Sequence, residues 1–168
     1  MTVAEEPTVR RADGSDMESV GQMLHDFNVE FDDPTPAPGV LADRMRELVD
    51  SDDTVVLLAG KGPDGLSVLR FRRAIWSEGL ECYLAEFYVK PSQRGRGIGR
   101  VLLDSSLHEA RQRGADTIDL GTDETDTVAR HLYESHGFTN RANGKGAQLC
   151  TSTNGNSDLY GPSIRCPD

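Results

Sequence analysis

Residues 93–100, Gln93-Arg94-Gly95-Arg96-Gly97-Ile98-Gly99-Arg100, separate two segments with regular hydrophobic patterns. The apolar, aromatic run at residues 82–89 is typical of a buried strand, and apolar side chains at helical spacing follow from Val101 to Ala110. A strand, a glycine-rich turn and a helix direct free backbone N–H groups to one place, where the helix dipole favours an anion. This segment, the glycine loop, therefore predicts an anion site whose arginines suit phosphate.

Two well-known phosphate motifs do not account for the glycine loop. The dinucleotide fingerprint G-x-G-x-x-G requires glycine where this chain has Arg100. A P-loop ends in Gly-Lys-Ser/Thr, and neither lysine nor a hydroxyl residue follows Gly99. The loop is therefore either another class of phosphate site or a surface connector with exposed arginines.

Three segments together resemble the GNAT superfamily of N-acetyltransferases. Residues 94–99 match its acyl-CoA pyrophosphate motif, Gln/Arg-x-x-Gly-x-Gly/Ala, at every fixed position. Residues 86–91 resemble the fourth strand of the family and the proline turn after it, and residues 129–138 resemble its A-x-x-L-Y-E-x-x-G-F segment. The resemblance covers residues 8–142, which we interpret as one GNAT N-acetyltransferase domain.

The hydrophobic patterns agree with the fold that this resemblance implies, an α/β domain with a mixed, mostly antiparallel sheet flanked by helices. The expected order is β-α-α-β-β-β-α-β-α-β. Helical spacing indicates helices around residues 20–27, 41–49, 101–110 and 125–136. Strands are expected at residues 8–12, 54–59, 66–76, 82–89 and 117–121, with a last strand that starts at Phe138.

The composition argues against several other classes of protein. The chain of 168 residues suits one domain, and no stretch approaches the roughly 20 apolar residues of a membrane span. A net charge of −10 disfavours nucleic acid or an anionic membrane as partner. The acidic residues either attract a cationic substrate or are ordinary solvated carboxylates of the surface. The three cysteines lack zinc or redox spacing and residues 1–7 show no secretory signal, so we expect a cytoplasmic protein without a metal.

The resemblance implies acetyl-CoA as cosubstrate, bound largely by the main chain. Amides of the glycine loop would hold the pyrophosphate, and the main chain of residues 87–89 would pair with the pantetheine arm. Where the fourth and fifth strands splay apart, the N–H of Val89 would face the thioester oxygen, a contact worth about 3–4 kcal/mol at the transition state. The expected cofactor-binding residues are Phe87, Tyr88, Val89, Arg94, Gly95, Arg96, Gly97, Ile98, Gly99, Arg100 and Asp126.

Two side chains are candidates for proton transfer. Tyr133 matches the position where many GNAT enzymes place a tyrosine that protonates the CoA thiolate, and its alternative role is packing beside Leu132. Glu86 is the candidate base, because a substrate ammonium with a pKa near ~10 must lose a proton before the amine attacks. Its alternative roles are binding of that ammonium or plain exposure on the strand.

Other polar side chains have less specific assignments. Asp126 stands where many relatives carry asparagine, and it either favours a cationic acceptor or caps the following helix. Four acidic residues are candidates for lining the acceptor cleft: Glu30, Asp32, Asp33 and Glu81. The histidines lack the spacing of metal ligands: His25, His108, His131 and His136.

These residues together predict the transfer of an acetyl group from acetyl-CoA to a primary amine, by direct attack in a ternary complex. The expected acceptor is a small cationic amine, and neither nucleic acid nor a membrane is an expected partner. A homodimer stays open. The alternatives are a non-catalytic acyl-CoA-binding module and an acetyltransferase that acts on a protein N-terminus or lysine.

The segment after residue 142 departs from the family pattern, which ends in an apolar, aromatic strand. Residues 143–168 are polar and poor in strand-forming residues. Read from the third base of the Leu149 codon, codons compatible with residues 149–158 also permit Met-Tyr-Phe-Tyr-Glu-Arg-Glu-Leu-stop, which resembles the missing strand. We therefore interpret residues 143–168 as an atypical, frameshifted tail that carries no site and leaves the sheet without its native edge strand.

Sequencing of the gene tests the frameshift hypothesis. The expected result is a nucleotide sequence in which a shift of one base restores that peptide. A gene in which no one-base shift encodes it excludes the hypothesis.

Overall fold

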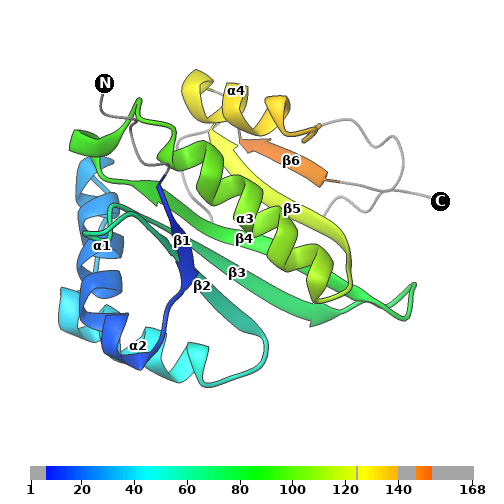
Figure 1. Ribbon diagram of the computed structural model, residues 1–168, viewed down its shortest axis with the longest axis horizontal. Helices are drawn as coiled ribbons and strands as arrows, with labels where there is room; N and C mark the ends of the chain where they lie inside the picture. Colours follow the sequence, from blue (N-terminus) through cyan, green and yellow to red (C-terminus); the bar gives the residue numbers. More distant parts are fainter. Residues whose placement is uncertain (1–6, 124, 140–146, 153–168) are drawn as a thin grey trace.

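A six-stranded mixed sheet organises the computed structural model, which describes residues 7–123, 125–139 and 147–152 (Figure 1). The strands follow one another across the sheet in chain order. The first three neighbouring pairs are antiparallel and the last two are parallel. The strands are β1 (Val9–Arg11), β2 (Thr54–Ala59), β3 (Gly65–Arg73), β4 (Leu80–Val89), β5 (Ala115–Asp123) and β6 (Ala147–Ser152).

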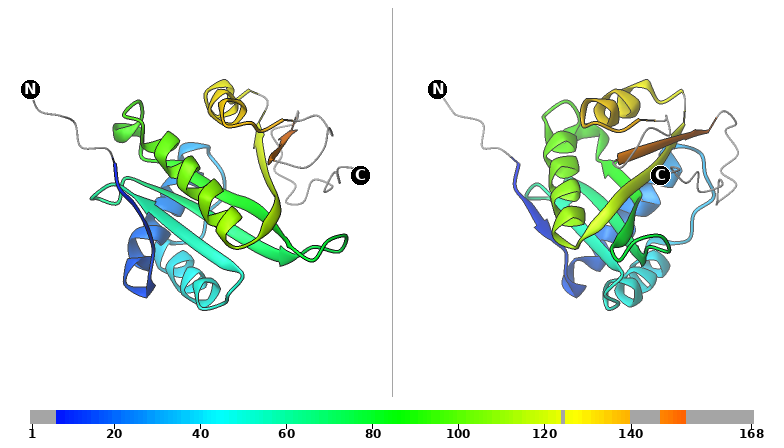
Figure 2. Two further views of the ribbon diagram at one scale, coloured as in Figure 1. Left: turned by 45° about the vertical axis from the view of Figure 1, so that its right-hand side comes forward. Right: turned by 90° about the vertical axis from the view of Figure 1, so that its right-hand side faces the viewer.

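Helices cover both faces of this sheet (Figure 2). The first two α-helices, α1 and α2, lie on one face, and the last two, α3 and α4, lie on the other. Within the described ranges, none of the helices combines the length and apolarity needed to cross a membrane. The helices are η1 (Gly14–Asp16), α1 (Met17–Glu30), α2 (Pro38–Val49), η2 (Pro91–Gln93), α3 (Ile98–Gln112) and α4 (Thr127–Ser135), of which η1 and η2 are short 3₁₀ turns.

The predicted order of elements and the mostly antiparallel character of the sheet are confirmed. The predicted start of the last strand at Phe138 is not confirmed: Phe138 lies outside any strand and its ring packs on Tyr133, Thr139 forms a β-bridge, and residues 140–146 lie outside the described residues. The sixth strand is β6, which pairs in parallel with β5. This polar segment forms a strand because main-chain N–H and C=O groups can pair whatever the side chains are. The rest of residues 143–168 lies outside the described residues, and the frameshift hypothesis stays a prediction.

Each face of the sheet buries its own apolar core. Leu102 and Leu103 of α3 belong to one core, and Met17 of α1 and Met45 of α2 belong to the other. Strand residues 55–58 alternate between the two cores, because successive side chains of a strand point to opposite faces. Burial on both faces explains why β2 reads as a continuous apolar run.

β4 contains a bulge at Ala85. Val68 of β3 pairs with Glu86, whereas the next residue of β3, Leu69, pairs with Leu84. Ala85 is therefore the extra residue on β4, and a residue of this kind reverses the alternation of the side chains that follow it.

The bulge decides which side chains of β4 reach each face. Before it, Leu84 points into the core under α3; after it, Phe87 and Val89 pack against that same core, and Tyr88 lies in the core under α1 and α2. Strict alternation from Leu84 would place residue 88 under α3 instead. Glu86 consequently faces the α1 and α2 side, together with its cross-strand partner on β3.

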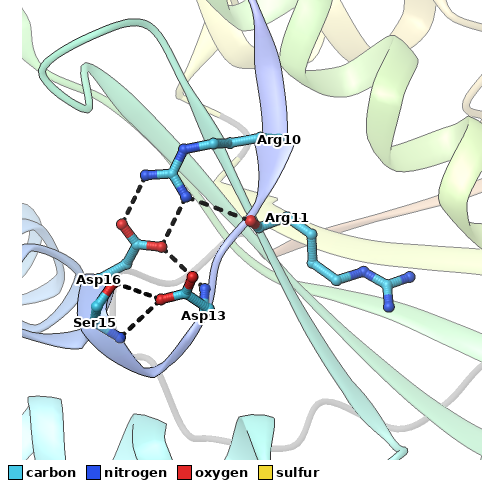
Figure 3. Close-up of polar contacts among 5 residues, drawn as sticks. All are labelled: Arg10, Arg11, Asp13, Ser15 and Asp16. Atoms are coloured by element: carbon cyan, nitrogen blue, oxygen red, sulfur yellow. Dashed lines mark hydrogen bonds and ion pairs between the residues drawn. The ribbon is translucent and has the colours of Figure 1, made fainter.

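A polar corner joins β1 to α1 (Figure 3). Arg10 donates two hydrogen bonds, each 2.7 Å long, to the carboxylate of Asp16. Asp16 also accepts the N–H of Asp13 at 2.9 Å, and the Asp13 carboxylate accepts the N–H of Ser15 at 2.8 Å. This reciprocal capping satisfies N–H groups at the start of η1, and the bond from Arg10 lowers the pKa of Asp16 to about 2.

We expect Asp16→Asn to destabilise the fold by about 1 kcal/mol at neutral pH, because it removes the charged acceptor of this corner. Folding lowers the pKa of Asp16, so its contribution is present above the unfolded value of 3.8 and is lost as pH falls toward about 2. Urea unfolding of wild type and variant should therefore converge over that interval. Asp50→Asn, at an exposed position, is the matched control. If the free energies of unfolding of wild type and Asp16→Asn differed by the same amount at every pH, the assignment would be contradicted.

Candidate active site

The glycine loop leads from the end of β4 into the first turn of α3. Gly95 and Gly97 have φ angles of 75° and 82°, in the left-handed region that glycine adopts without strain. Gly97 is the N-cap of α3, and no side chain of the described residues caps this helix end. A Cβ at Gly95 or Gly97 would meet nothing within 4 Å, so open space borders the loop. The first-turn N–H groups of α3 are therefore accessible, as the predicted anion site requires.

The three arginines of the glycine loop have different surroundings. Arg94 pairs with Glu30, and its Nε donates to the carbonyl of Val89 at 2.9 Å. Arg96 donates to the side-chain carbonyl of Gln93 at 3.2 Å. Arg100 is exposed on the first turn of α3. Arg96 and Arg100 thus lie at the surface beside the open helix end, whereas Arg94 is held by protein groups.

β4 and β5 separate next to the glycine loop. Their last ladder pair is Leu84–Leu120, although β4 continues to residue 89 and β5 to residue 123. After the bulge, β4 pairs with β3 on one edge but no longer with β5 on the other. A Cβ at Gly99 would lie 3.9 Å from side-chain carbons of Phe87 and Val89, so α3 starts directly against this separated part of β4. The splay implied by the family resemblance is present.

Glu86 stands at the start of the separated part of β4. Its side chain is half-buried on the sheet face that carries α1 and α2. Burial raises the pKa of its carboxyl from 4.5 to about 7, because the charged form is poorly solvated there. At neutral pH the carboxyl therefore both accepts and releases protons, as a general base requires.

Tyr133 of α4 lies on the opposite face of β4. It is 6% exposed, and its ring makes edge contacts with Phe87 and Phe138, each with centroids 5.9 Å apart. Burial raises the pKa of the phenol, and the negative charge of Asp126 adds to the shift. The phenol is therefore protonated at neutral pH. The packing role of Tyr133 is confirmed, and its role as a proton donor stays a prediction.

Asp126 caps α4. Its carboxylate accepts the N–H of Ala129 at 3.0 Å, which confirms the capping role expected from the sequence. A contact of Asp126 with the cofactor stays a prediction.

The acidic residues considered for the acceptor cleft have separate surroundings. Glu30 pairs with Arg94 at 2.6 Å, and Glu81 pairs with Arg72 at 2.5 Å. Residues 32–33 are exposed after the end of α1. The structure therefore does not gather these four residues into one cluster, and it gives Glu30 a partner in the glycine loop.

Sequence reasoning missed Asp119 of β5. Its neighbours Ile118 and Leu120 point into the core under α3, so Asp119 lies on the opposite face, where it pairs with Tyr83 of β4. Burial raises the pKa of Asp119, and the charge of nearby Glu81 adds to the shift. The signal was available, because a carboxylate between two apolar residues of a strand points away from the core that they fill.

Comparisons with known proteins agree with this geometry. An open helix start beside a separated pair of strands is typical of α/β proteins whose helix N-terminus receives an anionic ligand. The model of the acetyltransferase (GNAT) family matches residues 22–138, and the chain belongs to this family. The solved structure of a proposed acetyltransferase from Arthrobacter sp. FB24 is 42% identical, covers 92% of this chain and 97% of that protein, and gives a TM-score of 0.77.

Curated relatives match over shorter stretches. Mycothiol acetyltransferase from Thermobispora bispora is 44% identical over 66 residues, which are 38% of this chain and 22% of that relative. Streptothricin acetyltransferase from Streptomyces lavendulae is 29% identical over 118 residues, which are 70% of this chain and 61% of that relative. The chain thus spans less than two thirds of the length of either relative.

Proposed function

We propose that this chain transfers an acetyl group from acetyl-CoA to the primary amine of a small cationic acceptor, by direct attack in a ternary complex. The observation that carries the proposal is the splay of β4 from β5 immediately beside the glycine loop. This arrangement offers an anion site and an unpaired strand edge to one extended ligand that has a pyrophosphate at one end.

The residues present fit acetyl-CoA. The open start of α3, flanked by Arg96 and Arg100, suits the pyrophosphate. The β4 edge at residues 87–89 can hydrogen-bond an amide-containing arm as an added strand would. Bound acetyl-CoA would supply a thioester whose carbonyl carbon accepts the amine. The N–H of Val89 is the proposed donor to the carbonyl oxygen, and Asp126, the N-cap of α4, is a further proposed cofactor contact.

Glu86 and Tyr133 divide the proton transfers between the two faces of β4. Glu86 takes a proton from the attacking nitrogen on the α1 and α2 side, as the C–N bond forms. Tyr133 gives its phenol proton to the departing sulfur on the α3 and α4 side, as the C–S bond breaks. The products are an N-acetylated acceptor and the free thiol. The Glu86 carboxyl then releases its proton to solvent, and a solvent proton restores the Tyr133 phenol.

Charge supports a cationic acceptor. Glu86 and Asp119 lie on the sheet face opposite α3, where Glu81 is already paired with Arg72, and the whole chain carries a net charge of −10. Both curated relatives described above are named for small molecules, mycothiol and streptothricin, rather than for a protein. A small amine therefore fits better than a protein N-terminus or lysine.

A coupled assay of CoA release separates an enzyme from a binding module. We expect turnover with at least one member of a panel of polyamines, aminoglycosides, streptothricin and amino-acid derivatives. Tyr133→Phe should lower kcat about 100-fold, as loss of a general acid does, with an unchanged Kd for acetyl-CoA. The variant keeps the ring that packs on Phe87, so melting temperature should change little.

Other outcomes of this assay are equally informative. Tight binding of acetyl-CoA without turnover on any amine would identify a non-catalytic module. Preference for a peptide with a free N-terminus or lysine would replace the proposed acceptor class. Wild-type rates in Tyr133→Phe would remove Tyr133 from the mechanism.

The pH profile tests Glu86. Because only the carboxylate accepts a proton and its pKa is about 7, kcat/KM should fall as pH drops below about 7 and level off above it. Glu86→Gln should abolish this inflection. Its rate should instead rise about tenfold per pH unit toward the amine pKa near ~10, since only the neutral amine then reacts.

A control and a contrary outcome complete this test. Glu47→Gln changes an exposed carboxylate of α2 and should keep the wild-type profile. An inflection near pH 7 that survives in Glu86→Gln, with only a raised KM for the amine, would make Glu86 an ammonium contact rather than the base.

A further inference from the structure

Arg94, the first residue of the acyl-CoA motif, has a partly exposed guanidinium whose three nitrogens all bind protein groups. Nη1 and Nη2 donate to the two carboxylate oxygens of Glu30, at 2.6 and 2.8 Å. Nε donates to the carbonyl of Val89 at 2.9 Å, and the guanidinium carbon lies 5.8 Å from the centroid of the Tyr88 ring. A two-point bond to a carboxylate plus a third bond from Nε defines the plane of the guanidinium.

Glu30 comes from a distant part of the sequence. It is the last residue of α1, 64 positions before Arg94. The end of α1 is held on β4 by aromatic contacts, with Phe27 stacked on Tyr88 at 5.2 Å and Phe31 edge-on to Phe27 at 5.3 Å. Glu30 is therefore presented to Arg94 by a packed helix end.

The hydrogen bond from Arg94 to the carbonyl of Val89 fixes the oxygen of the peptide unit between Val89 and Lys90. The other polar group of that unit, the N–H of Lys90, donates to the carbonyl of Asp64 at 2.9 Å. The Val89–Lys90 peptide is thus fixed at both its oxygen and its nitrogen. This unit sets the direction in which the chain leaves β4 and enters the glycine loop.

We propose that Glu30 is a positioning residue, which orients Arg94 so that Val89 and the glycine loop are aligned for acetyl-CoA. This inference rests on the proposed function. Arg94 acts on the cofactor through the Val89 carbonyl and not as a direct phosphate ligand. The side chains of the pair are 46% and 29% exposed, and an ion pair so exposed contributes little to folding stability. Its effect should therefore appear in ligand binding.

Titration calorimetry with acetyl-CoA on the full chain separates positioning from direct phosphate contact. Positioning predicts that Glu30→Gln and Arg94→Gln each weaken binding about fivefold to tenfold, within the range of coupling between contacting residues. The double variant should be no weaker than Arg94→Gln alone. Arg94→Lys should bind as poorly as Arg94→Gln, because lysine keeps the charge but lacks the planar fork.

A direct phosphate contact predicts a different pattern. Glu30→Gln would then bind as tightly as wild type or more tightly, since it frees the guanidinium, and Arg94→Lys would retain most of the affinity. Either result overturns the proposal. Glu18→Gln, which breaks the pair between Glu18 and Arg46 on the α1–α2 surface, is the matched control and should leave acetyl-CoA binding unchanged.

Steady-state kinetics distinguish positioning from a merely structural role, because only positioning changes the KM for acetyl-CoA alone. Glu30→Gln should raise the KM for acetyl-CoA by the same factor as its Kd, with an unchanged KM for the amine and an unchanged melting temperature. An equal rise in both KM values, or a lowered melting temperature, would overturn the positioning role. Calorimetry measures binding without turnover. If wild type were inactive on every amine but Glu30→Gln still weakened acetyl-CoA binding, the proposed enzyme activity would be refuted, and the positioning role of Glu30 in binding would remain supported.

Discussion

The bulge at Ala85 is the constraint on which the arrangement of the site depends. It lets one strand present Tyr88 and Glu86 to the α1 and α2 side and Phe87 to the α3 and α4 side. Without it, the alternation of β4 would carry Glu86 into the core under α3, where an isolated carboxylate is costly. The proposed base and the proposed acid can thus act on opposite sides of a thioester bound along the β4 edge, the base at the attacking nitrogen and the acid at the departing sulfur.

The second constraint is the end of pairing between β4 and β5 at Leu84–Leu120. A paired β4 would have no free edge, and the start of α3 would face a closed sheet. The separation creates the edge, and the glycine loop places the open end of α3 beside it. The Glu30–Arg94 pair connects the β4 edge and the glycine loop to α1, because Arg94 also binds the peptide unit between that strand and the loop.

Much of the fold and part of the site were predictable from local patterns. Residues 54–59 and 82–89 are strands because apolar and β-branched side chains fit a buried sheet, and Asp126 caps α4 because its carboxylate reaches a free N–H three residues on. The position of β6 was not predicted, because β6 is held by main-chain pairing with β5, which side-chain patterns do not report. Asp119 was overlooked although its apolar neighbours Ile118 and Leu120 indicate its face; that Glu81 lies near it on that face is known only from the pairing of β4 with β5.

By itself, the sequence determined the order of the elements, the glycine loop and the family, because these depend on residue types at short, constant separations. Only the tertiary structure decided where β4 changes face, where it leaves β5, and that Arg94 of the motif pairs with Glu30 rather than standing free. Those features depend on contacts between residues far apart in the chain. No local pattern encodes such contacts, because the energy of a distant pair is realised only after the helices and strands have packed.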